Sequence, residues 1–114
     1  MTIQEQMRKG TTTVILLNLL ARMDRPMYGY EINRELEARS EGYFRFKEGL
    51  IYPRLHELER QGLLQSQWMG AEGTRRRKFY AITDQGRRQL EEELKGWQTL
   101  ARHVNHLLGV ETAS

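Results

Sequence analysis

Residues 50–83, LIYPRLHELERQGLLQSQWMGAEGTRRRKFYAIT, decide the fold. The first third of this stretch carries Ile51, Leu55 and Leu58 on one face of a helix, and Gly62 supplies the left-handed residue that often ends helices. This spacing predicts a helix over residues 50–61. Pro53 fits if the helix begins near residue 49 or 50, where the proline nitrogen falls among the first-turn positions that lack an acceptor.

The remainder of the stretch has the pattern of a β-hairpin. Residues 63–69 and 77–83 are rich in aromatic and β-branched side chains, and two glycines lie in the turn between them. Four consecutive cations, Arg75 to Lys78, have no adjacent carboxylate and give the hairpin a basic tip. We expect Trp68 to pack its strand against a helix.

Two further helices are predicted upstream. The first, residues 11–23, has an apolar band wide enough for two packing partners, and the hydroxyls of Thr11 to Thr13 are its expected N-caps. The second covers residues 28–39, and the aromatic residues of loop 40–49 should pin that loop to the domain. Three helices followed by a two-stranded wing define a winged helix-turn-helix, a mainly α fold of the α+β class.

The closing helix, residues 84–108 with Thr83 as its cap, bears on the oligomeric state. Its apolar residues recur at alternating spacings of four and three, the pattern of a coiled-coil seam. A helix of this length extends about 37 Å, whereas the rest of the chain should be about 26 Å across, so much of the seam overhangs. We therefore predict a homodimer whose interface contains Leu16, Leu20, Leu90, Leu94, Trp97, Leu100, Ala101, Val104 and Leu108.

Composition excludes several kinds of chemistry. The 114 residues suit one domain, and the absence of cysteine rules out disulfides, thiolate metal sites and a cysteine nucleophile. His103 and His106 lack a nearby third metal ligand, and no phosphate loop or nucleophile–base spacing is found. We predict neither enzyme activity nor a cofactor. With no membrane-length apolar run and no signal-peptide pattern, we expect a cytoplasmic protein without a membrane partner.

Positive charge is concentrated in the first part of the chain. The net charge is +3 overall, but residues 1–83 contain 14 basic and 10 acidic side chains, while residues 84–114 contain 4 and 5. A basic winged helix predicts double-stranded DNA as partner, with the third helix in the major groove and the wing along the backbone. Residues 1–83 would form the DNA-binding domain, and residues 84–114 the dimerisation helix with a short tail.

The expected DNA-binding residues lie on the third helix, in the loop before it and on the wing. Tyr52 and Arg54 are the main candidates for base contacts, because the first turns of a recognition helix lie deepest, and Arg60 for a phosphate contact. Either of the first two could instead be structural. The full set is Lys47, Tyr52, Arg54, His56, Arg60, Arg75, Arg76, Arg77 and Lys78. The alternative function is a winged-helix module that binds proteins within a larger assembly.

Motifs across nearly the whole chain point to a known family. They are YGYEI (28–32), EGLIYPRL (48–55), LE with GLL (58–64), RKFY (77–80) and ITDQG (82–86). Together they resemble the PadR family of bacterial transcriptional regulators. Where this chain has Ile51, that family usually has leucine.

The resemblance implies a homodimeric regulator, usually a repressor, that binds a palindromic operator. Some members are released from DNA by a small aromatic or cationic compound. In the subgroup with a single carboxy-terminal helix, a tryptophan there can flank a flat ligand between the subunits, and Trp97 stands at the corresponding place. Trp97 is otherwise a residue of the dimer seam, where large aromatics commonly supply buried area.

Overall fold

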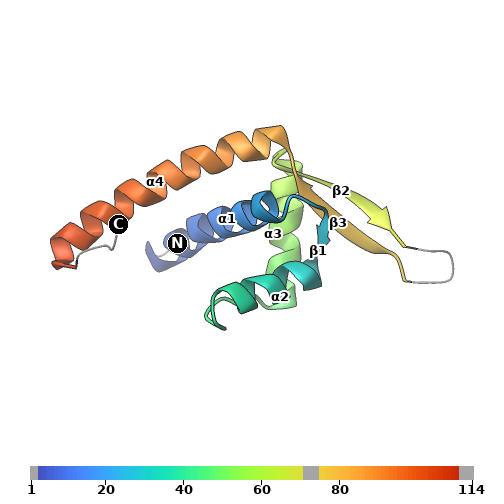
Figure 1. Ribbon diagram of the computed structural model, residues 1–114, viewed down its shortest axis with the longest axis horizontal. Coiled ribbons are helices and arrows are strands. Elements are labelled where there is room, and N and C mark those ends of the chain that lie inside the picture. The colour runs from blue at the N-terminus through green and yellow to red at the C-terminus, as the bar shows by residue number, and fades with distance from the viewer. Residues whose placement is uncertain (1–2, 71–74, 111–114) are drawn as a thin grey trace.

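The computed structural model describes residues 3–70 and 75–110 and has the predicted winged helix-turn-helix architecture (Figure 1). In chain order the elements are α1 (Ile3–Met23), β1 (Met27–Tyr28), α2 (Gly29–Arg39), α3 (Glu48–Arg60), β2 (Leu64–Met69), β3 (Arg77–Ile82) and α4 (Asp84–Leu108). The hairpin and α4 lie within one residue of their expected bounds.

The core lies where α1, α2 and α3 meet the sheet. The apolar faces predicted for the helices are buried there, together with Tyr80 from the sheet. The core residues are Leu16, Leu17, Leu19, Leu20, Met27, Ile32, Leu36, Ile51, Leu55, Leu58, Leu63, Leu64, Tyr80 and Leu90. Burying aliphatic side chains at about 1.5–3 kcal/mol each is the main source of stability in a domain without disulfides.

The sheet has a third strand that the sequence patterns did not predict. β3 lies in the centre, with β2 on one side and the two-residue β1 on the other, and both pairings are antiparallel. Met27 pairs with Tyr80, and Tyr28 pairs with Phe79. Because Tyr28 belongs to this strand, α2 begins one residue later than expected, at Gly29.

The starts of α1 and α3 also differ from the expectation. α1 begins at Ile3, so Thr11 to Thr13 lie inside the helix and are not its N-caps. The residues before them lack an apolar stripe, but they are mostly Gln, Glu, Arg, Lys and Met, which favour helix. α3 begins at Glu48, so Pro53 lies in the second turn, not the first, and leaves the carbonyl of Gly49 without its usual helical donor.

The loop between α2 and α3 is pinned by Phe46 and not by all of its aromatic residues. The Asn33 side chain both donates to the Phe46 carbonyl and accepts from the Phe46 amide, at 2.9 Å for the latter. Phe46 packs against the core, whereas Tyr43 is 83% exposed. The loop is therefore held at its end nearest α3, which places the start of that helix.

α4 packs along α1 and continues past it, as Figure 1 shows. Leu90 is buried and Leu94 packs against the core, while the later turns of α4 leave the body of the domain. The molecule is accordingly elongated, with extents of 57 × 31 × 29 Å. A left-handed Gly109, with φ of 72°, ends the helix.

Candidate nucleic-acid interface

The outward face of α3 is set by its three buried residues. Ile51, Leu55 and Leu58 anchor the helix in the core, so side chains on the opposite side project into solvent. That exposed face consists of Gly49, Leu50, Tyr52, Pro53, His56 and Arg60. Three of the expected DNA-binding side chains, those of Tyr52, His56 and Arg60, therefore share one open surface.

Arg54 lies on the flank of α3 instead. Its side chain is 18% exposed, and its Nη1 atom is 3.4 Å from Oε2 of Glu57. This contact uses one N–H group of the guanidinium and leaves its other donors available for a base or a phosphate. Lys47, the N-cap residue of α3, is exposed.

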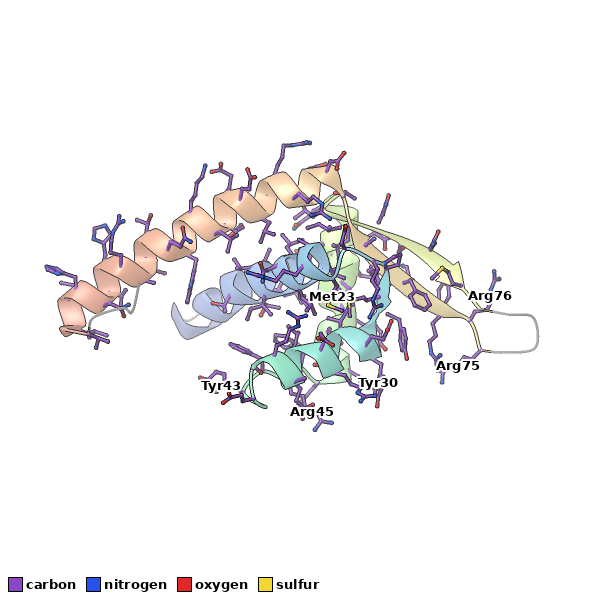
Figure 2. All side chains as sticks on the ribbon, viewed as in Figure 1. Met23, Tyr30, Tyr43, Arg45, Arg75 and Arg76 are labelled. Carbon is purple, nitrogen blue, oxygen red and sulfur yellow. The ribbon has the colours of Figure 1, made fainter. Side chains whose placement is uncertain are left out.

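The four consecutive cations of the wing divide into two groups. Arg75, Arg76 and Arg77 are exposed, and Figure 2 shows Arg75 and Arg76 at the outer end of the hairpin. Lys78 instead turns toward α3, where its Nζ atom is 3.0 Å from Oε1 of Glu59. Lys78 is therefore paired with a carboxylate and half-buried, unlike the three exposed arginines, and its predicted contact with DNA stays a prediction.

Glu59 joins the wing to α3. Its carboxylate accepts hydrogen bonds from the Ser66 hydroxyl on β2 and from the Lys78 ammonium on β3. The Ser66 hydroxyl and then Lys78 lower the pKa of Glu59 against the opposing effect of burial, and Glu59 raises the pKa of Lys78. Burial raises the pKa of the neighbouring Tyr80 phenol. This charged contact links both strands of the hairpin to α3.

A groove of about 690 Å³ lies between α3, the start of α2 and the wing. Tyr28, Tyr30, Tyr52, Trp68 and Tyr80 form its aromatic walls, and the basic run of the wing lines one side. Trp68 is 60% exposed, so it does not pack its strand against a helix as predicted.

Stacked cations and rings continue along the edge of the domain. The Arg77 guanidinium lies 4.7 Å from the centre of the Tyr28 ring, and Tyr28 stacks on Tyr30 at 6.3 Å. Arg34 lies 5.8 Å from the centre of the Tyr30 ring. Side chains from three elements thus form one ladder beside the groove.

The sequence analysis missed two cations beside α3. Arg34 and Arg45 line a second groove together with Lys47, between α2, its following loop and α3. Figure 2 shows Arg45, Tyr30 and Arg75 along the same edge of the molecule. Each of the two arginines stands among glutamates in the sequence, as in the pair between Arg45 and Glu37 at 3.7 Å, so local charge did not single them out.

The expected dimer residues also divide into two groups. Leu16, Leu20 and Leu90 are already buried inside one chain, so they have no surface left for a partner, and that part of the prediction is corrected. Along the later turns of α4, apolar side chains remain open, with Trp97 45% exposed. The exposed set is Trp97, Leu100, Val104, Leu107 and Leu108. Leu94 and Ala101, which were also predicted for the seam, are half-buried.

Other sites are absent from the part of the chain that the structure describes. Within residues 3–70 and 75–110, no three His, Cys, Asp or Glu side chains come together as a metal site. Over the same residues, no helix is long and apolar enough to cross a membrane.

Comparisons with known proteins agree with this geometry. The sequence profile of the "Transcriptional regulator PadR-like family" matches residues 16–92. The chain is 33% identical to the transcriptional regulator Rv3488 of Mycobacterium tuberculosis, over 86% of this chain and 89% of that protein. A PadR-like transcriptional regulator from Bacillus cereus is similar in structure, with a TM-score of 0.74 and 32% identity over 93% of this chain and 99% of that one. A transcriptional regulator from Clostridium thermocellum has a TM-score of 0.79 and 27% identity, over 89% and 96% of the two chains.

Proposed function

Since the chain belongs to the PadR-like family of transcriptional regulators, we propose that it represses transcription as a symmetric dimer that binds a palindromic operator in double-stranded DNA. Members of this family are regulators and not enzymes, in agreement with the sequence analysis. The observation that carries the proposal is the exposed face of α3, which opens onto the same groove as Arg75, Arg76 and Arg77.

In this proposal, α3 and the wing make different contacts with DNA. α3 enters the major groove and presents Tyr52, His56 and Arg60 to base edges or to phosphate. The exposed arginines of the wing contact phosphate, which adds affinity through counterion release without sequence information. The missed cations, Arg34 and Arg45, lie on the other side of the start of α3, where a second phosphate strand would pass.

The exposed apolar stripe of α4 supports the dimer. Its side chains lie on the later turns of α4, and the described residues (3–70 and 75–110) leave them between 38% and 84% exposed. A stripe of this kind suits a second copy of the same helix in a twofold arrangement. Two α3 helices held in this way would reach half-sites about 34 Å apart, one turn of DNA.

Trp97 supports release by a small aromatic effector. The indole lies on the proposed interface with nearly half of its surface open. Flat ligands commonly bind in apolar pockets between subunits, where an aromatic side chain stacks on them. In this proposal Trp97 serves the interface and the effector together.

Selection of bound duplexes from a random pool tests the DNA-binding proposal. We expect an inverted repeat with half-sites about one helical turn apart. Replacing Arg75, Arg76 and Arg77 with alanine should weaken binding to every duplex and reduce the slope of log K against log salt by about 2–3 units. The matched control replaces Arg88, Lys95 and Arg102, which lie seven residues apart on α4 opposite the seam and remove the same charge. Salt-independent, negligible duplex binding would favour the protein-interaction alternative.

Sedimentation tests the dimer. We expect Val104→Glu to give monomers at micromolar concentration, because the new carboxylate would be buried in the seam. Thr99→Glu adds the same charge on the opposite side of α4 and should leave the dimer intact. A Val104→Glu protein that still sediments as a dimer would rule out this interface.

A further inference from the structure

We propose that Trp68 is a DNA-contacting residue, which packs its indole against the sugar-phosphate strand that crosses between α3 and the wing. The inference rests on the proposed function and assigns a sequence-independent contact to a residue that neither the motifs nor the charge pattern singled out.

The position of Trp68 follows from the register of the hairpin. Ser66 and Trp68 are two residues apart on β2 and therefore share a face of the sheet. Ser66 is hydrogen-bonded to Glu59, so this face is turned toward α3. Trp68 lies further along the strand, opposite Lys78, where α3 no longer covers it and 60% of its surface is open.

The surroundings of Trp68 suit an anionic, partly apolar occupant. Its groove is also lined by Tyr52 and His56 from α3 and by the three exposed arginines of the wing. Among the described residues that line it, Glu48 is the one carboxylate. A DNA strand offers phosphate to the arginines and the apolar face of deoxyribose to the indole. The indole Nε1–H can donate to a phosphate oxygen from the same position.

The wing is held in place for this contact before DNA binds. Lys78, the cross-strand neighbour of Trp68, is bonded to Glu59 on α3. The distance between Trp68 and the exposed face of α3 is therefore maintained by a charged contact, so little ordering is required when a strand enters the groove.

Fluorescence provides a direct test, because the chain has two tryptophans in different places. In a Trp97→Phe protein, emission comes from Trp68 alone, and we expect it to be quenched or shifted when any duplex is added. In a Trp68→Phe protein, emission from Trp97 should stay unchanged, since no residue of α4 lines the groove. The same titrations yield affinities.

Trp68→Ala should lower the affinity of the protein for the selected operator and for an unrelated duplex by the same factor. We expect this factor to be about tenfold if DNA covers half of the exposed area of the indole. Trp68→Phe should lose less affinity for both duplexes, because the phenyl ring keeps part of the apolar contact. Tyr43→Ala removes an aromatic ring that is more exposed than Trp68 but lies outside the groove, and it should leave the affinity for DNA unchanged. If Trp68→Ala does not fold, the Trp68→Phe affinities and the Trp68 emission decide the question.

The outcomes separate this inference from the proposed function. Duplex binding with unchanged Trp68 emission and unaltered Trp68→Ala affinity would overturn the role of Trp68 and leave the regulator intact. If Trp68→Ala lost affinity for the selected operator alone, the inference would also be overturned, because Trp68 would then contact bases. Failure of the unmodified protein to bind any duplex would overturn both.

Discussion

Gly86→Ala should disrupt the junction between the winged helix and α4. The glycine is buried in the first turn of α4, and a Cβ atom there would lie 2.1 Å from the Leu63 carbonyl oxygen and 2.8 Å from Cγ1 of Ile82. Ordinary carbon–oxygen contacts are about 3.3 Å or more, so the helix start would have to move by about 1 Å. The atom in the way is backbone, which cannot rotate aside.

That movement would also break a network centred on Thr83. The Thr83 hydroxyl accepts from the Gly86 amide at 2.9 Å and donates to the Gly62 carbonyl at 2.7 Å. Overpacking costs about 1–3 kcal/mol and loss of an N-cap about 0.5–2, against a gain of about 1 from the better helix propensity of alanine. We expect a net loss of about 2 kcal/mol in the free energy of unfolding.

The matched control is Gly96→Ala in the same helix. A Cβ atom at Gly96 would meet nothing within 4 Å, so only helix propensity changes and we expect a gain of about 1 kcal/mol. Urea unfolding of both variants, with m-values compared, measures the difference. One protein concentration is used for both, because the stability of the proposed dimer would depend on concentration. A Gly86→Ala protein within about 1 kcal/mol of the unmodified chain would refute the reasoning.

Two further predictions concern the candidate interface. At Gly29 a Cβ atom would lie 2.6 Å from Cε1 of Tyr52, a ring that can move. Gly29→Ala should therefore alter the operator sequence that is selected, with little effect on the free energy of unfolding. Selection of the same operator by the variant and by the unmodified protein would contradict this. Glu59→Gln should cost about 1 kcal/mol at pH 7, since the carboxylate and Lys78 are only partly exposed. Because the pKa of Glu59 is lowered on folding, this deficit should be constant between pH 4.5 and 10.5 and should vanish as pH falls through the folded pKa of Glu59. Because the pKa of Lys78 is raised, the pair's contribution should also be lost at high pH, above 10.5. Urea unfolding across pH measures both limits, and a deficit that persists at acid pH would contradict the first.

The parts of the fold predicted correctly are those set by local pattern. Ile51, Leu55 and Leu58 specify the buried face of α3 whichever elements cover them, and their burial leaves Tyr52 and His56 outside. The hairpin and α4 are likewise bounded by turn and cap residues close to their ends.

Errors arose where a residue's role depends on distant partners. β1 has two residues and exists only because it pairs with β3, about 50 residues later in the chain. The wide apolar band of α1 was assigned partly to a second subunit, but α4 and the rest of the core cover Leu16 and Leu20 within one chain. Pattern shows that a face is buried, not which element buries it.

Lys78 could have been placed from strand alternation. It stands two residues before Tyr80, so both side chains project from the same side of β3. Tyr80 is large, aromatic and buried, which turns that side inward, whereas Arg77 projects from the other side. Four adjacent positive charges do not indicate which side of the strand each side chain occupies. The contacts of Glu59 could not be predicted from its neighbours in the sequence, because both of its partners lie on strands that follow it.

The positions of Thr83 and Glu59 bear on how a dimer interface can control DNA binding. Thr83, at the start of α4, is hydrogen-bonded to Gly62 and Leu63, the short link between α3 and β2. Glu59, one turn earlier on α3, holds the wing through Ser66 and Lys78. No flexible linker separates α4 from the winged helix at this point. A change in the angle between two α4 helices, such as an effector beside Trp97 would impose, must therefore rotate α3 and the wing together. In the proposed dimer, release from DNA would follow from altered half-site spacing and would not require either DNA-binding unit to unfold.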